Sequence, residues 1–362
     1  MHVTSLLLKD FRNYSEQSLR FSSGTNLIYG KNAQGKTNIL EAVYMFSQGK
    51  SHRAKSDKEL IRFGSEFFRA AVEFETAQRE YKSVMTFAKN GKKSIKMNGV
   101  QIKKLSMLMN YLNTVMFSPE DLSLVKGSPT ARRKFMDLAI SQLFPKYLVN
   151  LIEYNKALAQ KNSLLKTLKF SGKTSDVMLS VWNEQLGETG AKIMQYRLDF
   201  LEILRGFASA IQREISGESL ELSYSPGIKI ESISKEDFTN ALENAQHREI
   251  EMRSALYGIQ RDDICIGING NDAKLYASQG QQRTTALTMK IALSDYIHHI
   301  KEEYPVLLLD DIMSELDKSR RLYLAEKIKD KQVLITATDT DIIKSTDTTK
   351  LFYAENGTIR EE

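Results

Sequence analysis

The sequence has few of the side chains from which a metal centre or a disulfide scaffold is built. It contains one cysteine, Cys265, and five histidines, of which only His298 and His299 are adjacent. A single thiol cannot form a disulfide framework within the chain, and the scattered histidines show none of the spacings of zinc modules. The composition therefore excludes a disulfide-rich scaffold and a cysteine-based zinc domain.

Long hydrophobic runs are missing as well. No stretch of about 18 consecutive apolar residues occurs, so the sequence predicts no helix that spans a membrane. The N-terminal segment lacks a basic start, and it reaches Lys9 and Asp10 too soon for a secretory signal peptide. We therefore expect a cytoplasmic protein without a membrane partner.

The residues that are present favour a globular protein with a mild positive charge. Hydrophobic residues make up 41% and charged residues 27% of the 362 residues, which is enough for a sizeable core. A chain of this length predicts about two domains, or one core with a large insertion. Lysine and arginine number 51 against 45 acidic residues, a net charge of +6. This balance permits an anionic partner such as a nucleic acid but does not require one.

The first hundred residues predict several strands and one helix that follows a glycine-rich loop. Asn26–Tyr29 is a short apolar strand, and Asn38–Phe46 places Ile39, Val43 and Phe46 at helical spacing. Further strands are predicted at Thr4–Lys9, Phe67–Phe74, Tyr81–Phe87 and Ser94–Met97. The dipeptides Asn90-Gly91 and Asn98-Gly99 are typical of hairpin turns between such strands.

The middle of the chain, about residues 130–255, is rich in helix formers. Leu151, Leu158 and Leu165 recur every seven residues, and residues 201–215 continue an apolar stripe on a second segment. With a plausible turn at Phe170–Lys173, this pattern predicts an antiparallel helical hairpin. The alternative is a buried helix pair inside an ordinary domain, because so few heptads do not establish a coiled coil.

The last part of the chain returns to alternating strands and helices. Val306–Leu309 and Val333–Ile335 are continuous apolar runs, as buried parallel strands require, and helices are expected at Gln282–His299 and Lys318–Asp330. The fold class is therefore α/β. We expect one domain from residues 1–125 and 256–362, with residues 126–255 as a helical insertion.

The strongest local signal is a phosphate-binding loop. Its residues, Gly30, Lys31, Asn32, Ala33, Gln34, Gly35, Lys36 and Thr37, fit the pattern GxxxxGK[ST] between a predicted strand and a predicted helix. Glycine lets backbone N–H groups approach phosphate oxygens, and Lys36 adds a positive charge for the β- and γ-phosphates. The Thr37 hydroxyl can ligate Mg²⁺. The sequence thus predicts that the chain binds a nucleoside triphosphate, with ATP and Mg²⁺ as cofactors.

Two carboxylates follow a predicted strand in the last part of the chain. Asp310 and Asp311 come directly after the apolar run Leu307–Leu309. In a nucleotide site with a phosphate loop, Asp310 is placed to hold Mg²⁺, and Asp311 to orient or deprotonate the attacking water. The alternative interpretation is a strand that ends in a polar turn. With Lys36, these two residues are the predicted catalytic groups of the sheet edge.

A third motif stands just before the helix expected at Gln282–His299. By itself, Ser278-Gln279-Gly280-Gln281 reads as an N-cap serine in a glycine turn. The order of this motif, the helix, Asp310-Asp311 and then Ser314–Asp317 resembles that of an ABC-type ATPase head. On that resemblance Ser278 and Gly280 correspond to the signature motif, and Ser314–Asp317 to the D-loop. Thr336–Asp339 stands where such ATPases carry a switch histidine, which this chain lacks.

The long separation between Thr37 and Ser278, filled by a helical insertion, distinguishes the chain from transporter subunits. In this and in further motifs the sequence resembles the RecF family of SMC-like ATPases. The matching segments are Phe11–Tyr14, Gly49–Arg53, Phe117–Leu122, Lys126–Pro129, Arg132 with Arg133 and Asp137, and Gln260–Asp263. In the last segment the family usually reads Gly-Pro-His-Arg-Asp-Asp, whereas this chain has Gly258-Ile259-Gln260 before Arg261. The resemblance covers essentially the whole chain.

The resemblance implies an ATPase that forms a head-to-tail homodimer on ATP, in which Ser278 of one subunit faces the γ-phosphate held by the other. Arg12 is implied as a further nucleotide contact. It also implies binding of double-stranded DNA near gaps and junctions, cooperation with RecR and RecO in loading recombinase, and a slow, DNA-stimulated hydrolysis that resets the dimer. The expected role is recombinational repair and replication restart.

Three basic clusters are candidates for contact with the DNA backbone. They are Lys89, Lys92, Lys93, Lys96, Lys103 and Lys104; Lys50, Arg53 and Lys55; and Arg132 with Arg133. The alternative for each cluster is an ordinary solvated face. Two other functions stay open: an ABC-type ATPase subunit coupled to a protein partner, and a small-molecule kinase with a phosphate loop. Neither predicts that DNA changes ATP turnover.

Overall fold

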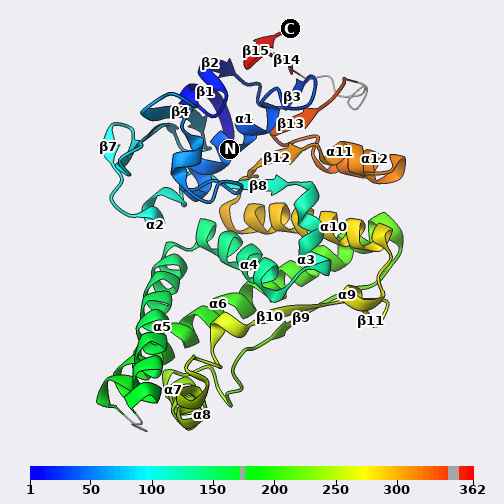
Figure 1. Cartoon of the computed structure of the whole chain (residues 1–362). Helices are drawn as coiled ribbons and strands as arrows, with labels where there is room; N and C mark the ends of the chain where they lie inside the picture. The colour runs from blue at the N-terminus through cyan, green and yellow to red at the C-terminus, as the bar shows by residue number, and fades with distance from the viewer. Residues whose placement is uncertain (172–175, 341–349) are drawn as a thin grey trace. The chain divides into compact units, whose positions relative to one another are not determined.

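The computed structural model describes residues 1–171, 176–340 and 350–362 (Figure 1). Its packing divides the chain into two compact units. The sheet unit comprises Met1–Leu122, Glu214–Gly217 and Arg283–Glu362, and the helical unit comprises Ser123–Arg213 and Glu218–Gln282. Among the described residues, no helix is both long and apolar enough to cross a membrane.

A six-stranded, mostly parallel sheet forms one layer of the sheet unit. Its order is β15-β14-β3-β13-β12-β8, and only β15 runs antiparallel to its neighbour. The strands are Thr25–Tyr29 (β3), Thr114–Phe117 (β8), Val306–Asp310 (β12), Val333–Ala337 (β13), Lys350–Glu355 (β14) and Thr358–Glu361 (β15). The predicted strands at β3, β12 and β13 are confirmed. Their apolar runs are buried throughout, because strands of a parallel sheet are covered on both faces.

A second, antiparallel sheet of six strands has the order β2-β1-β4-β5-β6-β7. Its strands are His2–Phe11 (β1), Tyr14–Arg20 (β2), Phe67–Glu75 (β4), Glu80–Ala88 (β5), Lys93–Met97 (β6) and Val100–Gln101 (β7). Asn90-Gly91 and Asn98-Gly99 lie in the connections that join β5 to β6 and β6 to β7, as predicted. Buried and exposed residues alternate along β4, as expected for a sheet with one covered face.

The helices of the sheet unit connect the parallel strands. They are α1 (Lys36–Gln48), α2 (Leu105–Leu108), α11 (Ile312–Glu315), α12 (Lys318–Lys327) and most of α10 (Gln279–Lys301), with 3-10 turns η1 (Asp57–Leu60) and η2 (Pro119–Leu122). Parallel neighbours need such crossovers because their ends lie at opposite edges of the sheet. The helices predicted at residues 38–46, 282–299 and 318–330 are thereby confirmed, with shifted ends.

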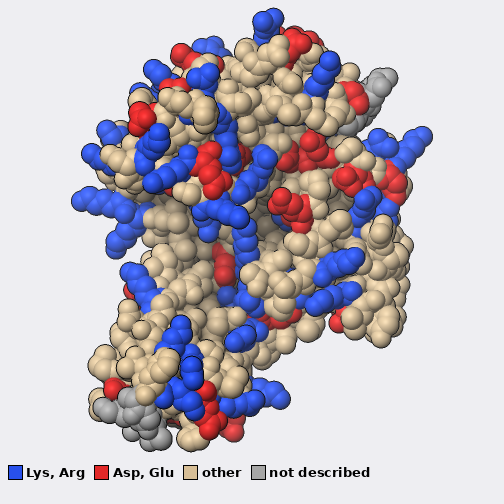
Figure 2. Space-filling view, in the orientation of Figure 1, with Lys and Arg blue, Asp and Glu red and all other residues tan. Residues whose placement is uncertain are grey.

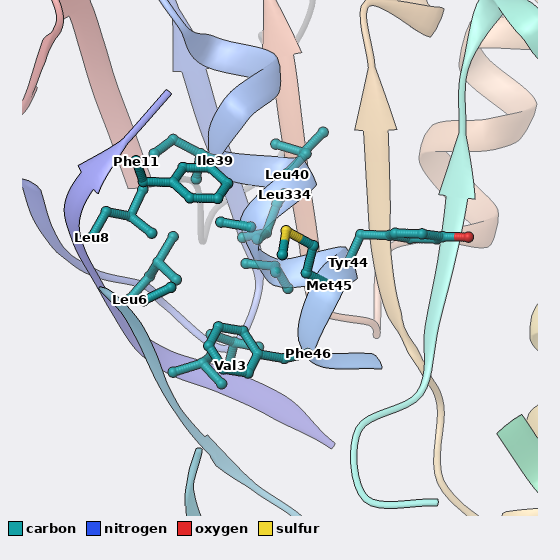
Figure 3. Close-up of a cluster of buried hydrophobic side chains, with 14 of the residues drawn as sticks. Val3, Leu6, Leu8, Phe11, Ile39, Leu40, Tyr44, Met45, Phe46 and Leu334 are labelled. Atoms are coloured by element: carbon teal, nitrogen blue, oxygen red, sulfur yellow. The ribbon is translucent and has the colours of Figure 1, made fainter. Parts of the chain in front are cut away.

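Helix α1 lies between the two sheets, and its packing fixes the phosphate loop at its start. Figure 3 shows Ile39, Leu40 and Phe46 of this helix beside side chains of β1, such as Leu6 and Phe11. The same buried cluster includes residues of β3, β12 and β13. Because α1 is buried from Ile39 to Gln48, it has little freedom to move relative to either sheet.

The helical unit has its own small sheet, which the sequence analysis did not predict. Strands β9 (Leu220–Ser225), β10 (Asp263–Ile268) and β11 (Asn271–Asp272) pair in the order β11-β10-β9. Its helices are α3 (Ser123–Lys126), α4 (Pro129–Leu143), α5 (Pro145–Ser171), α6 (Val177–Ser216), α7 (Lys235–Asn244), α8 (Gln246–Met252) and α9 (Ala273–Tyr276), with the 3-10 turn η3 (Ile259–Arg261). The last turn of α6 belongs to the sheet unit.

The two long helices expected in the insertion are present as α5 and α6. Leu165 and Leu168 of α5 share a small buried cluster with Leu179 of α6, next to the connection between the helices. Most of the turn predicted at Phe170–Lys173 lies outside the described residues. Leu151 and Leu158 are only half-buried, whereas Tyr154 and Lys161 are fully buried. The buried stripe of α5 is therefore offset from the leucine repeat.

The offset has a polar cause. The Lys161 ammonium forms a 2.6 Å ion pair with Glu249 of α8, and both side chains are completely buried. Asn162 accepts a hydrogen bond from the Ala255 backbone N–H beside this pair. A buried charge must find a partner, so this pair sets which face of α5 turns inward.

The compact units also differ from the expected domain boundaries. Residues 256–282, which were expected in the ATPase domain, pack within the helical unit. The reason is local, since β10 pairs with β9 and the segment before it binds a buried arginine.

That arginine, Arg197 of α6, is the centre of the polar core of the helical unit. Its guanidinium donates to Asp137 at 2.8 Å and to Asp262 at 2.6 Å, and its side chain is 1% exposed. Asp262 also accepts hydrogen bonds from the Tyr224 hydroxyl and the Gly227 backbone N–H. The motif residues Arg261–Asp263 thus have a structural setting: they tie β10 to the helices.

Arg132 and Arg133, proposed above as DNA contacts, belong to the same polar core. Arg132 is 4% exposed and binds both carboxylate oxygens of Asp263, at 2.6 and 2.8 Å. Arg133 donates to the Asp262 carbonyl at 2.8 Å. The expectation that this cluster faces DNA is therefore wrong for Arg132, because its positive charge is buried and neutralised by a carboxylate.

We predict that Arg197→Met destabilises the helical unit by about 3–5 kcal/mol, because it leaves buried carboxylates without their partner. Lys192→Met on the same helix is the matched control. Lys192 pairs with Glu188 in an exposed i,i+4 arrangement, so we expect a loss of at most about 0.5 kcal/mol. Hydrogen exchange of amides in α6 and β10 gives the free energy of opening. Equal effects of the two substitutions would contradict the assigned role of Arg197.

Candidate nucleotide-binding site

The phosphate loop connects β3 to α1 and depends on two glycines with positive φ. A Cβ on Gly30, at φ 143°, would lie 2.3 Å from the Ala354 carbonyl oxygen. A Cβ on Gly35, at φ 102°, would lie 2.5 Å from the side chain of Asn13. Neither position accommodates another residue without a shift of its surroundings, so the loop geometry explains why glycine stands at both.

The start of α1 offers unpaired backbone donors to an anion. Its N-cap, Gly35, provides no side-chain hydrogen bond, and the first turn contains no acidic residue. The first backbone N–H groups of a helix lack partners within the helix and carry partial positive charge. Directly after a strand and a glycine loop, this helix end has the properties of a phosphate site.

Lys36 keeps its ammonium group inside the loop. The amine donates to the carbonyl oxygens of Gly30 at 2.7 Å and Lys31 at 3.0 Å, and the residue is only 4% exposed. Burial lowers the pKa of Lys36, while the charges of Asp311 and Asp310 act in the opposite direction. A positive charge is thus held where the loop would surround phosphate oxygens.

The structure brings the predicted metal ligands together. The Thr37 hydroxyl donates to Asp310 Oδ1 at 2.7 Å, and the Thr336 hydroxyl donates to the same oxygen at 2.8 Å. A hydroxyl and a carboxylate are oxygen donors of the type that Mg²⁺ prefers. Among the described residues no group of three His, Cys, Asp or Glu side chains could hold a metal. The donor set therefore fits an ion that is bound largely by phosphate and water.

Asp311 follows at the end of the same strand in a left-handed conformation, with φ 50°. Its backbone N–H donates to Thr336 Oγ1 at 3.0 Å, and the Ser314 hydroxyl donates to its carbonyl oxygen. Burial raises the pKa of the Asp311 carboxyl, the charge of Asp310 raises it further, and Lys36 acts in the opposite direction. A carboxyl with this raised pKa, beside Lys36, suits a group that positions or accepts a proton.

The turn between β1 and β2 holds the phosphate loop from outside. Asn13 donates to the Gln34 carbonyl at 3.0 Å, and the Tyr14 hydroxyl donates to the Gly35 carbonyl at 3.0 Å. Asn38 of α1 donates in turn to Asn13 Oδ1 at 2.8 Å. The sequence analysis noted this segment as a family motif but did not predict its contact with the loop. No local pattern could have indicated it.

Arg12 has a different neighbour from the nucleotide contact that the resemblance implied. Its guanidinium donates to both carboxylate oxygens of Glu41, at 2.9 and 2.7 Å, and to the Glu59 carbonyl at 3.0 Å. Glu41 is fully buried on α1 and also accepts from the Ser51 hydroxyl at 2.5 Å. Arg12 therefore anchors α1, and three of its five N–H groups are engaged.

Ser278 and Gly280 belong to the helical unit, whereas Lys36, Asp310 and Asp311 belong to the sheet unit. The Ser278 hydroxyl accepts from the Gln281 backbone N–H at 3.2 Å, and Gln281 Oε1 accepts from the Ser278 N–H at 2.8 Å. This reciprocal arrangement is a capping box at the start of α10. The N-cap interpretation of the motif is correct as local structure and leaves its role in ATP binding open.

The segment Phe117–Leu122 connects to α10 within the sheet unit. Lys290 of this helix binds Asp121 at 2.8 Å and the Met116 carbonyl at 2.6 Å. Arg283, one turn into the helix, binds Glu315 at 2.8 Å. The helix that begins with the signature motif is therefore tied by ion pairs to the segments after β8 and after β12.

The remaining basic clusters lie at the surface of the sheet unit. The exposed members are Lys50, Arg53, Lys55, Lys89, Lys92, Lys96, Lys103 and Lys104. Lys93 is the exception, because its amine binds Asp57 and the Gly49 carbonyl, both at 2.7 Å. Figure 2 shows Lys and Arg side chains gathered over the part of this unit that carries β7.

Comparisons with known proteins agree with the fold and the site. A family model described as the RecF/RecN/SMC N terminal domain matches residues 2–360. The chain is 40% identical to the DNA replication and repair protein RecF of Bacillus cereus (strain G9842), over 99% of this chain and 98% of that protein. It is also 40% identical to RecF of Bacillus thuringiensis (strain Al Hakam), with the same coverage.

Solved structures give the same result. A recombination mediator protein RecF–ATP, described as part of the RecFOR pathway, matches with a TM-score of 0.93 and 36% identity, over 100% of this chain and 97% of that one. An SMC head bound to the C-winged helix domain of ScpA matches with a TM-score of 0.60 and 17% identity, over 100% and 97%. The second likeness shows the ABC-type head fold alone.

We predict that Gly35→Ala weakens ATP binding by about one to two orders of magnitude. An alanine at φ 102° is strained by about 1–3 kcal/mol, and its Cβ would push against Asn13 and Tyr14, so the loop must change shape. Isothermal titration calorimetry with ATP measures the affinity. Gly206→Ala in α6 is the matched control, since no atom lies within 4 Å of the added Cβ. Unchanged affinity in Gly35→Ala would contradict this account of the loop.

Proposed function

This chain belongs to the RecF family within the RecF/RecN/SMC group, and we propose that it is an ATP-dependent DNA-binding protein of recombinational repair and replication restart. The observation that carries the proposal is the phosphate loop with Thr37 and Asp310 joined at 2.7 Å, in a chain alignable over its whole length with RecF proteins. Such a protein would work in the cytoplasm, where bacterial DNA lies.

The residues of the sheet edge have distinct roles in this proposal. The backbone N–H groups of Gly30–Thr37 hold the phosphates of ATP, and the Lys36 ammonium neutralises charge on the β- and γ-phosphates. Thr37 and Asp310 hold Mg²⁺, which would bridge the β- and γ-phosphates and withdraw charge from them. Asp311 orients the attacking water and takes up its proton late in the reaction, because the transition state is loose. ATP is thereby hydrolysed to ADP and phosphate.

Ser278 and Gly280 complete the site from a second copy of the chain. A phosphate loop surrounds one side of the γ-phosphate, and the signature motif of a partner subunit would close the other side. Nucleotide that binds only the closed dimer stabilises the dimer by mass action. Slow hydrolysis, stimulated by DNA, then opens it. The chemistry of ATP would serve as a timer for a clamp.

The exposed lysines of the sheet unit supply the DNA contact. Contacts from Lys and Arg to phosphate position a protein on a duplex without reading its sequence, and their strength falls with salt. The cluster of β5–β7 and its neighbours, from Lys89 to Lys104, and that of Lys50–Lys55 are exposed and suited to this task. We propose gapped or junction-bearing duplex DNA as the substrate, and RecR and RecO as the protein partners in recombinase loading.

The test of this proposal is fluorescence anisotropy of a labelled gapped duplex with ATP, ADP or no nucleotide, at two salt concentrations. We expect binding that requires ATP, weakens with salt and is lost in Lys36→Arg. The broad guanidinium cannot replace an ammonium that fits between the Gly30 and Lys31 carbonyls. Lys192→Arg, at an exposed ion pair of the helical unit, is the control and should bind like the wild type.

Other results would favour the alternative functions. Binding that ignores nucleotide, or no binding at all, would leave the ABC-type ATPase but move its partner from DNA to a protein. A phosphorylated product and an unimpaired Ser278 variant would instead identify a small-molecule kinase.

We further predict that Ser278→Arg abolishes dimerisation on ATP and spares ATP binding. Because Ser278 belongs to the helical unit, its replacement leaves the phosphate loop untouched, while a large cation blocks the partner's γ-phosphate face. Analytical ultracentrifugation with and without ATP measures the dimer, and calorimetry measures ATP binding. Ser163→Arg, at an exposed position of α5, is the control. A Ser278→Arg variant that still dimerises on ATP would rule out the composite site.

A further inference from the structure

Phe63 is the most exposed large hydrophobic side chain among the described residues, at 100%. It stands in the connection between η1 and β4, in the sheet unit. Single exposed hydrophobic residues are common on protein surfaces and need no explanation by themselves. The geometry of the turn and the charges around it distinguish Phe63 from such residues.

The turn that carries Phe63 is tightly held. The Ser65 N–H donates to the Arg62 carbonyl at 2.9 Å, and Gly64 has φ 88°, as a type II turn requires at its third residue. Asp10 fastens both ends, because its carbonyl accepts from the Arg62 N–H and its carboxylate accepts from the Ser65 hydroxyl, both at 2.8 Å. The aromatic ring is therefore presented on a rigid support.

The surroundings of Phe63 are positively charged. Between residues 50 and 69 the basic side chains are all exposed, and they are Lys50, Arg53, Lys55, Lys58, Arg62 and Arg69. Of the three acids in this range, Asp57 pairs with Lys93 and Glu66 pairs with Lys89. Lys9 of β1 stands directly opposite Arg69 of β4 on the same face, with Glu16 of β2 on its other side. An aromatic ring among exposed cations fits a polyanion that also offers flat apolar surfaces.

We propose that Phe63 stacks on the base exposed where duplex DNA meets a single-stranded gap, while the neighbouring cations hold the phosphates. This inference rests on the proposed DNA-binding function and assigns its junction preference to one residue. At a gap edge, the last base pair has a face without a stacking neighbour, and an unpaired base is free to stack on an aromatic ring. Phe63 reads this feature by shape and without regard to base identity.

The same physics explains discrimination against continuous duplex DNA. There every base is already stacked on both faces, so an inserted ring would first have to unstack a base step, at a cost of a few kcal/mol. The phosphate contacts are alike on both substrates. Phe63 therefore adds affinity on gapped DNA and next to none on a continuous duplex.

A comparison of Phe63→Ala with wild type on two labelled DNAs of equal length, one gapped and one continuous, tests the inference in the presence of ATP. We expect gapped-duplex binding to weaken about tenfold, the size of one aromatic–base stack, with continuous-duplex binding unchanged. Phe63→Trp should restore the preference. Phe170→Ala, at an exposed phenylalanine of the helical unit, is the matched control and should bind both DNAs like wild type.

A spectroscopic readout tests the stacking directly. Trp182 is the single tryptophan of the chain, so Phe63→Trp in a Trp182→Phe background places the only indole at the turn. We expect its fluorescence to be quenched by gapped DNA and not by the continuous duplex. Equal quenching by both DNAs, or none by either, would overturn the assignment.

The remaining outcomes separate this inference from the function on which it rests. Wild type that binds neither DNA would refute the DNA-binding function itself. Wild type that prefers gapped DNA, with the same preference in Phe63→Ala, would overturn only the role of Phe63. Normal DNA binding by Phe63→Ala with loss of dimerisation on ATP, measured by ultracentrifugation, would assign the ring to contact with a second copy of the chain.

Discussion

One carboxylate oxygen organises the nucleotide site. Oδ1 of Asp310 accepts hydrogen bonds from Thr37, which follows β3, and from Thr336 on β13, so a single atom joins three neighbouring strands at one edge of the sheet. The carboxyl ends of parallel strands meet at such an edge, where the next residue along each strand is free of the ladder. Asp311 is placed by the same set of contacts, since its N–H binds Thr336. The phosphate loop, the metal ligands and the proposed water-orienting group are therefore fixed relative to one another by the fold.

The sequence predicted what is contiguous or periodic and missed what depends on burial. Gly30–Thr37 and Asp310-Asp311 could be identified because phosphate and metal chemistry needs those residues in adjacent positions after buried strands. The contact of Asn13 and Tyr14 with the loop could not, because it arises only when the antiparallel sheet packs on α1. Arg132 was misplaced for a related reason. Its partner Asp263 is 131 residues away, and a charge in a sequence does not reveal whether a carboxylate has already neutralised it.

Buried charges have different consequences in the two units. In the helical unit, Arg197 and Lys161 are completely enclosed by their partners and determine which helix faces turn inward. In the sheet unit, Arg12 holds Glu41 of α1 in the same manner, beside the phosphate loop. A structural ion pair at the base of a binding loop removes conformational freedom that a ligand would otherwise have to suppress. Such preorganisation favours affinity for the phosphates without any added contact to them.

The turn between β1 and β2 also connects the proposed nucleotide and DNA contacts. Asn13 and Tyr14 bind the carbonyls of the phosphate loop, while Asp10 and Arg12 bind the backbone of the segment that ends at Phe63. Asp10 and Arg12 both adopt left-handed conformations, with φ 51° and 54°, so the turn is a defined and strained piece of backbone. A shift of the loop around phosphates would pass through few bonds to the aromatic tip. This short, contiguous path gives ATP a physical means to influence how DNA is held, because the two proposed contacts share one support.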